Sequence, residues 1–340
     1  MEITKKQEGT FLRLLKAFKN LTPATIRNYH EELFDDGSFM YFVTNYKDWT
    51  PDEHDGLKNL LELPKNSNGY YIDKYQQRIS YNGIRTLKRA KTEIELNDLQ
   101  QAEYDKCESD YKYFRRHYCL ITTKTGLARP EPRHYQAQLE DDLLSLEDVV
   151  ILYPRQSGKT VTAATYLLWL SIFHNIQINI GIVANKPKTA REVLDKIKKI
   201  FVELPIWLQP GLEVWNKSEI EYENGTRVMT DSPSSDSFRG YTCNIIYVDE
   251  AAYIKNNLWE EFIDAVMPTM NSLIFKQVIV TSTASGMNHF YQLCEGAYPK
   301  IPEEKKNVLQ GDDDVKIFDY HNKKITYKTI EEIYEERFND

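Results

Sequence analysis

From residue 134 onward the chain alternates between short apolar runs and longer amphipathic stretches. The apolar runs predict buried strands at 149–153, 178–184, 245–249 and 277–282. The stretches between and before them predict helices at 134–144, 161–170 and 188–204. A Glu-Asn-Gly turn predicts a hairpin, with strands at 220–222 and 227–229. Nearly continuous apolar strands separated by helices are typical of a mostly parallel sheet that is covered on both faces.

The first part of the chain is more polar, rich in Tyr, Lys and Glu, with a helical pattern. One long charged helix is predicted at 93–118, with an apolar stripe that Gln100 and Glu103 interrupt. The stripe consists of Leu96, Leu99, Cys107, Tyr111 and Phe114. An Arg-Pro-Glu-Pro turn follows this region. We therefore divide the chain into an N-terminal helical region at 1–128, an α/β core at 129–290 and a C-terminal segment at 291–340, with a last helix at 330–338.

Composition and charge narrow the class of protein. With 340 residues, 41% hydrophobic and 28% charged, the chain has the make-up of a globular protein with a sizeable core. Its apolar stretches are too short to span a bilayer, and its N-terminus lacks the apolar core of a signal peptide. The 4 cysteines have no paired spacing, which predicts reduced thiols and no zinc site. A net charge of −8 means that contact with DNA requires a partner or a local basic patch. The stretch 186–199 is one such patch, although a solvated helix face explains it equally well.

The segment that carries most chemistry reads Tyr-Pro-Arg-Gln-Ser-Gly-Lys-Thr, at 153–160. A strand, a loop and a helix that begins at Gly-Lys-Thr form the context of a phosphate-binding loop. Backbone N–H groups at the helix N-terminus point toward a phosphate. Lys159 then reaches the β- and γ-phosphates, and the Thr160 hydroxyl holds Mg²⁺. Tyr153 stands where the usual pattern has its first glycine, so a chance Gly-Lys-Thr in a strand–helix turn is the alternative.

Two adjacent carboxylates, Asp249 and Glu250, follow the predicted strand at 245–249. A phosphate-loop enzyme needs an acid at the end of a neighbouring strand to hold the Mg²⁺ shell, and Asp249 suits this role. Glu250 can act as the general base that polarises the attacking water. Ligands of parallel sheets lie at the carboxyl ends of the strands, where we expect both acids and the loop to meet.

Three further groups of residues are weaker candidates. Arg155 lies within the loop, where it can swing toward the γ-phosphate as an arginine finger or form a salt bridge at the surface. Tyr135 and Gln136 begin a helix upstream of the loop, and a tyrosine face with a neighbouring amide can stack on adenine and pair with its edge. Hydroxyls at the end of the last strand can sense the γ-phosphate, and they belong to Thr281, Ser282 and Thr283.

The order and spacing of these motifs resemble the large terminase subunit of tailed bacteriophages, of the contractile-tailed-phage type. The resemblance covers roughly residues 114–293 and includes an Arg-Gly pair at 239–240 and Gly-Met-Asn-His-Phe-Tyr at 286–291. A phosphate loop with Arg-Gln in place of the usual glycine looks like this family, which accounts for Tyr153. The nucleotide-binding residues that the resemblance implies are Tyr135, Gln136, Arg155, Gln156, Ser157, Gly158, Lys159 and Thr160.

The same resemblance implies further roles, a fold and cofactors. Glu250, Arg155 and Lys159 are expected to be catalytic. Mg²⁺ is expected at Thr160 and Asp249, and coupling of hydrolysis to motion at 281–283. The implied fold is a P-loop NTPase of the ASCE type, a mostly parallel sheet flanked by helices. A smaller, mainly helical lid subdomain is expected from the two flanking regions. The implied cofactors are ATP and Mg²⁺.

The resemblance also implies a function, namely ATP hydrolysis that powers translocation of double-stranded viral DNA into the procapsid, in the cytoplasm of an infected bacterium. The implied partners are the DNA, the portal protein and the small terminase subunit, in a ring oligomer on the procapsid, with a monomer in isolation and no membrane. About fifty residues follow Thr283, which is too few for a further domain, so we expect no nuclease activity. Two other functions stay open: another DNA-stimulated, helicase-like ATPase, or a nucleotide-dependent assembly switch.

Overall fold

The computed structural model describes residues 63–295, with gaps at 124–125 and 175, together with three strands nearer the C-terminus. These strands are β12 (Lys306–Val308), β13 (Asp314–Asp319) and β14 (Lys324–Thr329). The helix predicted at 330–338 lies outside the described residues. Within the described ranges, the helices are too short or too polar to cross a membrane.

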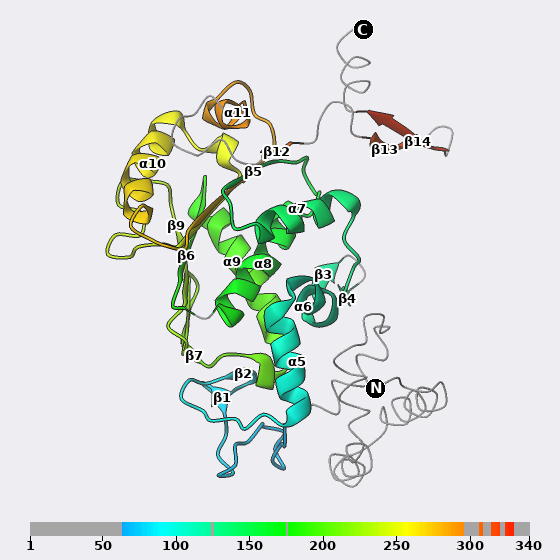
Figure 1. Ribbon diagram of the computed structural model, residues 1–340, viewed down its shortest axis with the longest axis vertical. Helices are drawn as coiled ribbons and strands as arrows, with labels where there is room; N and C mark the ends of the chain where they lie inside the picture. Colours follow the sequence, from blue (N-terminus) through cyan, green and yellow to red (C-terminus); the bar gives the residue numbers. More distant parts are fainter. Residues whose placement is uncertain are drawn as a thin grey trace.

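An eight-stranded sheet forms the centre of the molecule, in the order β12-β5-β11-β10-β6-β9-β8-β7 (Figure 1). The strands expected from the sequence are β5 (Val149–Leu152), β6 (Asn179–Ala184), β8 (Glu219–Tyr222), β9 (Arg227–Asp231), β10 (Ile245–Asp249) and β11 (Gln277–Ser282). Neighbouring strands pair in parallel from β12 across to β9, whereas β8 and β7 (Leu212–Trp215) add antiparallel pairs at the other edge. The predicted mostly parallel sheet is therefore confirmed, and β7 and β12 are strands that the apolar pattern did not reveal.

The central strands are apolar on both faces because helices cover both sides of the sheet. In β10, Ile245 and Tyr247 belong to one buried cluster, and Ile246 and Val248 belong to a second cluster on the opposite face. This alternation follows from strand geometry, in which successive side chains point to opposite faces. A strand buried on both sides reads as an unbroken apolar run, which is why its position is visible in the sequence.

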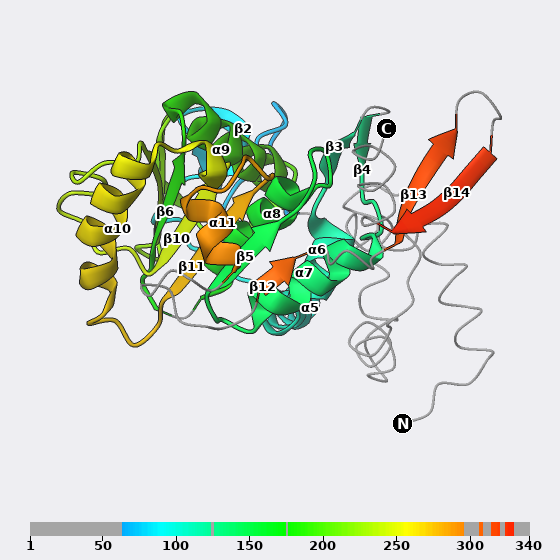
Figure 2. The same ribbon diagram turned by 90° about the horizontal axis from the view of Figure 1, so that it is seen from above.

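Helices form a layer on each side of the sheet (Figure 1 and Figure 2). One layer contains α7 (His134–Leu144), α8 (Lys159–Phe173) and α9 (Pro187–Val202). The other contains α10 (Asn256–Met270) and α11 (His289–Cys294). Nearly every residue of α8 is buried, because sheet and neighbouring helices enclose it, and this explains its apolar, Ala-rich sequence. The three helices predicted from periodicity after residue 133 are thus confirmed.

The single long helix expected at 93–118 is wrong. The structure has two helices there, α5 (Asp98–Ser109) and α6 (Tyr111–Tyr118). Asp110 ends the first with an extended backbone and caps the second, because its side chain accepts a hydrogen bond from Tyr113 N. Aspartate is a favoured N-cap, and this local preference outweighs the continuous charged pattern that suggested one helix.

The polar interruption in the apolar stripe of this region is a buried carboxylate. Glu103 is fully buried and accepts hydrogen bonds from the hydroxyls of Tyr113 and Tyr118. Tyr118 and Phe114 belong to the same hydrophobic cluster as the sheet residues, so α6 packs directly on the core.

Residues 63–92 form a small β-rich unit at the antiparallel edge of the sheet, with β1 (Ser80–Tyr81) and β2 (Ile84–Lys88). Gln209 ties it to the core, since its Nε2 donates to Thr86 O over 2.9 Å. Gly211 lies so close to this unit that a Cβ there would be 2.6 Å from the Ala90 Cα. A second short hairpin, β3 (Ile121–Thr123) and β4 (Gly126–Ala128), follows α6.

Candidate active site

The Gly-Lys-Thr loop connects β5 to α8 at the carboxyl edge of the sheet, as the sequence predicted. Two of its residues have left-handed backbones, Gln156 at φ 62° and Gly158 at φ 91°. Gly158 is the N-cap of α8, so the first N–H groups of the helix open toward the loop. A Cβ at Gly158 would lie 2.2 Å from Gln136 Nε2. Both the backbone and this neighbour therefore favour glycine.

A hydroxyl in the interior of the loop is unsatisfied. Ser157 is 5% exposed, and its Oγ has no hydrogen-bond partner among the described residues. The Ser157 carbonyl, by contrast, accepts hydrogen bonds from Tyr135 Oη at 3.1 Å and Gln136 Nε2 at 3.0 Å. Buried polar groups are nearly always paired, so an unpaired one calls for an explanation such as a bound group. A phosphate oxygen in the loop would supply the missing partner.

Lys159 and Thr160 each contact one of the two carboxylates that follow β10. Lys159 Nζ lies 3.1 Å from Glu250 Oε1, and Thr160 Oγ1 donates to Asp249 Oδ2 over 3.2 Å. The Lys159 side chain is 6% exposed and that of Glu250 is 25% exposed, so this ion pair is largely withdrawn from water. The loop and the acids, 89 and 91 residues apart in these two pairs, thus share one site.

Asp249 is the more deeply buried of the two acids. It accepts hydrogen bonds from Thr281 Oγ1 at 2.9 Å and from Glu250 N at 3.0 Å. Burial raises the pKa of the Asp249 carboxyl, and the nearby Lys159 opposes this effect. Carboxylate and hydroxyl oxygens are the ligands that Mg²⁺ prefers, and it is usually held by few protein groups plus phosphates. The residues fit this mode, since no cluster of three or more His, Cys, Asp or Glu occurs in the described part.

Glu250 has an uncommon backbone conformation. Its φ is 53° and its ψ is 41°, the left-handed region, and it is the N-cap of the short helix η2 (Ala251–Tyr253). Non-glycine residues held there cost about 1–3 kcal/mol and cluster at functional sites. The conformation turns the chain sharply after β10, so that Asp249 and Glu250 both reach the phosphate loop.

The expectation that the acidic strand is the direct neighbour of the loop strand is wrong. β11 pairs with both β5 and β10 and separates them. The hydroxyls that end β11 therefore lie between the loop and the acids. Thr281 bonds to Asp249, and Ser282 Oγ accepts a hydrogen bond from Ala252 N at 3.0 Å. The structure joins these hydroxyls to the segment that carries the acids.

Arg155 lies on the exposed side of the loop and contacts a residue that sequence reasoning missed. Its Nη2 donates to Tyr253 Oη over 3.4 Å, and its guanidinium lies 6.0 Å from the Tyr253 ring centroid. Tyr253 Oη in turn lies 3.1 Å from Thr283 Oγ1. No described carboxylate forms a salt bridge with Arg155. The only signal for Tyr253 in the sequence was its place shortly after Glu250.

Tyr135 and Gln136 lie at the start of α7, beside the loop. The Gln136 Oε1 accepts a hydrogen bond from Arg133 N at 2.9 Å, while its Nε2 contacts Ser157. Tyr153, which replaces the usual glycine, is 1% exposed and donates its hydroxyl proton to Tyr135 O over 2.8 Å. Tyr153 therefore anchors α7 to the loop strand. Adenine recognition by these residues stays a prediction.

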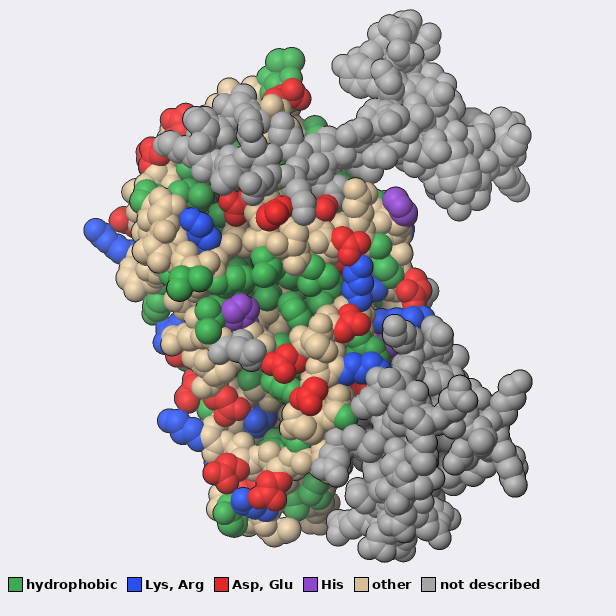
Figure 3. All heavy atoms as spheres, in the orientation of Figure 1, with side chains coloured by type: hydrophobic (Ala, Val, Ile, Leu, Met, Phe, Trp, Pro, Cys, Tyr) green, Lys and Arg blue, Asp and Glu red, His purple; other side chains and the backbone are tan. Residues whose placement is uncertain are grey.

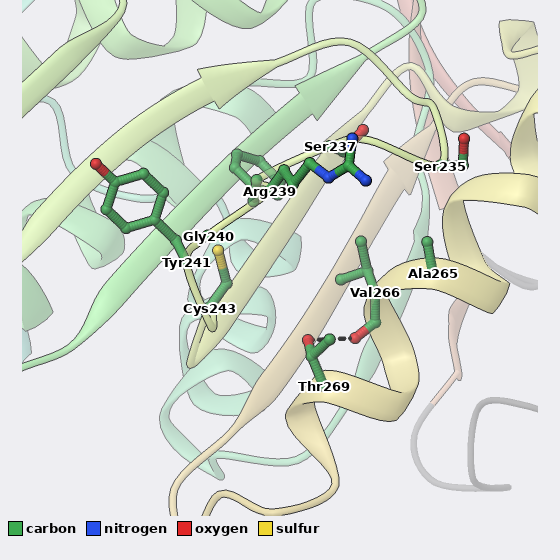
Figure 4. A pocket seen from close by; sticks show the side chains of 10 residues that line it. Ser235, Ser237, Arg239, Gly240, Tyr241, Cys243, Ala265, Val266 and Thr269 are labelled. Carbon is green, nitrogen blue, oxygen red and sulfur yellow. Dashed lines mark hydrogen bonds between the residues drawn. The ribbon is translucent and has the colours of Figure 1, made fainter.

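The Arg-Gly pair lies at a different place in the fold. Arg239 and Gly240 line a cavity of about 210 Å³ between the segment before β10 and helix α10 (Figure 4). Cys243 in its wall precedes the amino end of β10, whereas Asp249 ends that strand at its carboxyl side. Arg239 pairs with Asp236 at 3.2 Å, and its side chain is 83% exposed.

The basic stretch 186–199 is partly engaged by its surroundings. Lys188 pairs with Glu192 at 4.0 Å, and Lys198 donates to Asn216 O and lies 5.0 Å from the Trp215 ring centroid. Acidic and basic side chains are interspersed over the face shown in Figure 3. These contacts favour the interpretation of the stretch as a solvated helix face.

Comparison with known proteins assigns the family. A family model described as the N-terminal part of the terminase large subunit, T4likevirus-type, matches residues 150–335. The chain belongs to this family. The match includes the phosphate loop, both acids and the strand-end hydroxyls.

Individual terminases are similar over shorter parts. Tripartite terminase subunit 3 of human herpesvirus 8 is 30% identical over 149 residues, which is 40% of this chain and 20% of that protein. The HK97 bacteriophage large terminase is 17% identical, over 63% of this chain and 46% of that one, with a TM-score of 0.49. A large terminase from a thermophilic bacteriophage, in complex with ADP, is 13% identical over 47% and 41%, with a TM-score of 0.38. The chain spans about a fifth of the length of the curated relatives it matches.

Proposed function

We propose that this terminase chain is an ATPase motor that hydrolyses ATP with Mg²⁺ to translocate double-stranded viral DNA into a procapsid. The observation that carries the proposal is the meeting of Lys159 and Thr160 with Glu250 and Asp249 at the carboxyl edge of the sheet. Membership of the terminase family supports the packaging role. The unpaired Ser157 hydroxyl and the open N-terminus of α8 support a phosphate ligand.

In this mechanism each side chain has one task. Lys159 orients the β- and γ-phosphates, and Asp249 with Thr160 holds the metal. Bound Mg²⁺ neutralises charge that develops on the phosphate oxygens. Glu250 accepts a proton from the attacking water, for which its position beside Lys159 is suitable. Arg155 turns from Tyr253 toward the γ-phosphate and stabilises the transition state.

We infer that the coupling of hydrolysis to motion runs through the hydroxyls that end β11. Thr281 contacts the metal-binding acid, so loss of the γ-phosphate changes the forces on this strand end. The regions 1–128 and 291–340 would form the lid subdomain that moves in response. The portal protein, the small terminase subunit and a ring of copies on the procapsid, in the cytoplasm of an infected bacterium, would complete the motor. These assignments stay predictions.

The test is hydrolysis of radiolabelled ATP by the purified chain, with Mg²⁺, in the presence and absence of double-stranded DNA. Lys159→Ala should abolish turnover, because the lysine that neutralises the phosphates is gone. Lys188→Ala is the matched control, since Lys188 is an exposed lysine whose side chain is 84% accessible. Equal turnover in Lys159→Ala and wild type would refute the proposal.

The same preparation separates the alternatives. Strand separation of a DNA duplex would indicate a helicase-like translocase, and tight ATP binding without phosphate release would indicate an assembly switch. DNA packaging into purified procapsids, with the small subunit added, would support the motor. The absence of nuclease activity in these 340 residues stays a prediction. Nicking of a supercoiled plasmid in Mg²⁺ or Mn²⁺ would contradict it.

A further inference from the structure

The hydroxyl of Tyr253 joins three parts of the site that lie far apart in the sequence. It accepts a hydrogen bond from Arg155 Nη2 at 3.4 Å, across 98 residues, and lies 3.1 Å from Thr283 Oγ1, across 30 residues. Tyr253 itself ends the short helix η2 that begins directly after Glu250. One phenol oxygen thus contacts the candidate arginine finger and the candidate coupling segment, from the turn that follows the candidate base.

The turn that carries Tyr253 is fixed to the segment after β11. Ala252 N donates to Ser282 Oγ at 3.0 Å, and Asn288 Nδ2 donates to Ala252 O at 2.6 Å. His289 Nε2 lies 3.0 Å from Ala251 O. Because successive residues of η2 are bonded to this segment, Tyr253 and the strand-end hydroxyls move together.

The hold of Tyr253 on Arg155 is weak enough to be exchanged. A donor–acceptor distance of 3.4 Å is longer than the usual range for N–H···O hydrogen bonds. The ring contact at 6.0 Å is at the outer limit of a cation–π interaction. A charge-assisted hydrogen bond from arginine to a phosphate oxygen is roughly twice as strong as a neutral one. A γ-phosphate within reach therefore wins the guanidinium from the phenol.

We propose that Tyr253 is a positioning residue that holds Arg155 away from the phosphate loop until a γ-phosphate draws the arginine in. This inference rests on the proposed function. When Arg155 leaves, Tyr253 keeps its bond to Thr283 alone. The departure of the arginine is thus communicated to the coupling segment through one hydroxyl. The hydrogen bonds from Thr283 and Arg155 also lower the pKa of Tyr253, which is consistent with a phenol oxygen that acts as an acceptor for both.

The test uses Tyr253→Phe, which removes the hydroxyl and keeps the ring. The affinity of the full chain for a non-hydrolysable ATP analogue and for ADP is measured by titration calorimetry with Mg²⁺. The analogue should bind about two- to tenfold more tightly to the variant, because Arg155 no longer breaks a bond to reach the γ-phosphate. ADP affinity should be unchanged, since ADP has no γ-phosphate. In an Arg155→Ala background the same substitution should have no effect, which makes the pair a double-mutant cycle.

Tyr241→Phe is the matched control. The Tyr241 hydroxyl also accepts a hydrogen bond from an arginine, Arg227 Nη1 at 3.1 Å, under a guanidinium 5.2 Å from the ring centroid. Tyr241 and Tyr253 are 43% and 38% exposed. The control should change neither affinity.

Each outcome decides the proposal. Equal changes for ADP and the analogue, no change for either, or the same change with Arg155→Ala would overturn it. Should Tyr253→Phe fail to fold, Tyr253→Met also removes the hydroxyl at similar volume and carries the same expectation. If wild type binds no ATP analogue at all, the proposed function fails first, and this result is distinguishable from an unchanged ratio of the two affinities.

Discussion

Lys159 Nζ and Glu250 Oε1 lie 3.1 Å apart in a largely buried ion pair. A buried lysine without a partner is strongly destabilising, so Glu250 satisfies the charge of Lys159. In the proposed reaction the γ-phosphate competes with Glu250 for the same ammonium group. The carboxylate that gives up Lys159 is then the one that activates water. One contact therefore links nucleotide binding to readiness for catalysis, and it makes Glu250 the most informative position to change.

Glu250→Gln should lower the rate of phosphate release by about 10²- to 10⁴-fold, the usual contribution of a general base. Its affinity for ATP should be equal or higher, because the amide does not compete for Lys159. Single-turnover hydrolysis and binding of a fluorescent ATP analogue measure the two quantities. Glu261→Gln, at an exposed position on α10, is the control and should behave as wild type. Turnover of Glu250→Gln at the wild-type rate would refute the assignment of the base.

Arg155→Ala should reduce turnover much more than it reduces ATP affinity. An arginine finger contributes about 10³- to 10⁵-fold to the rate, because it acts on charge that develops in the transition state. We expect the affinity for an ATP analogue to fall by less than about tenfold. Steady-state kinetics with parallel binding titrations give both values. Arg191→Ala, on the exposed face of α9, is the control. Equal losses in rate and affinity would make Arg155 a binding residue only.

Asp249→Asn should melt at or above the wild-type temperature at neutral pH. Burial raises the pKa of Asp249 in the folded protein, above its value of about 3.9 in the unfolded chain. Between these two values the folded state binds more protons, so its stability falls as the pH rises through that window. Asparagine removes the buried charge, and each kcal/mol recovered raises the melting temperature by about 2–4 °C.

The measurement is thermal unfolding of both proteins from pH 7.5 down into the acidic range, where the difference should shrink. Addition of Mg²⁺ with an ATP analogue should stabilise wild type more than Asp249→Asn. Asp195→Asn, an exposed position on α9, should show no such pH dependence. A lower melting temperature for Asp249→Asn at pH 7.5 would show that the hydrogen bonds of the carboxylate outweigh its burial.

Glu103→Ala should destabilise the fold by about 2–4 kcal/mol, without a direct effect on the site. The substitution leaves the hydroxyls of Tyr113 and Tyr118 without their buried acceptor and removes packed volume. Asp105→Ala on the same helix loses only an exposed contact with Gln101 and should stay within about 0.5 kcal/mol of wild type. Urea unfolding followed by circular dichroism gives both values. Equal stability of the two variants would contradict the role of Glu103 in the core.

Local sequence was sufficient for the elements and for the ends of the site. The unbroken apolar runs of β10 and β11 predicted strands because both of their faces are buried. Gly158 and Lys159 marked the loop because only a glycine tolerates the left-handed backbone beside Gln136. Where two local preferences competed, the prediction failed: Asp110 begins a new helix within a charged stretch that reads as one helix.

The sequence by itself determined which residues carry chemistry, because strand burial and the turn into α8 are properties of neighbouring residues. Only the tertiary structure decided their partners. The place of β11 between β5 and β10, and the contacts of Tyr253 with Arg155 and Thr283, depend on how distant segments pack. Hydrophobic periodicity records whether a side chain is buried, and it holds no information about which strand or residue lies beside it.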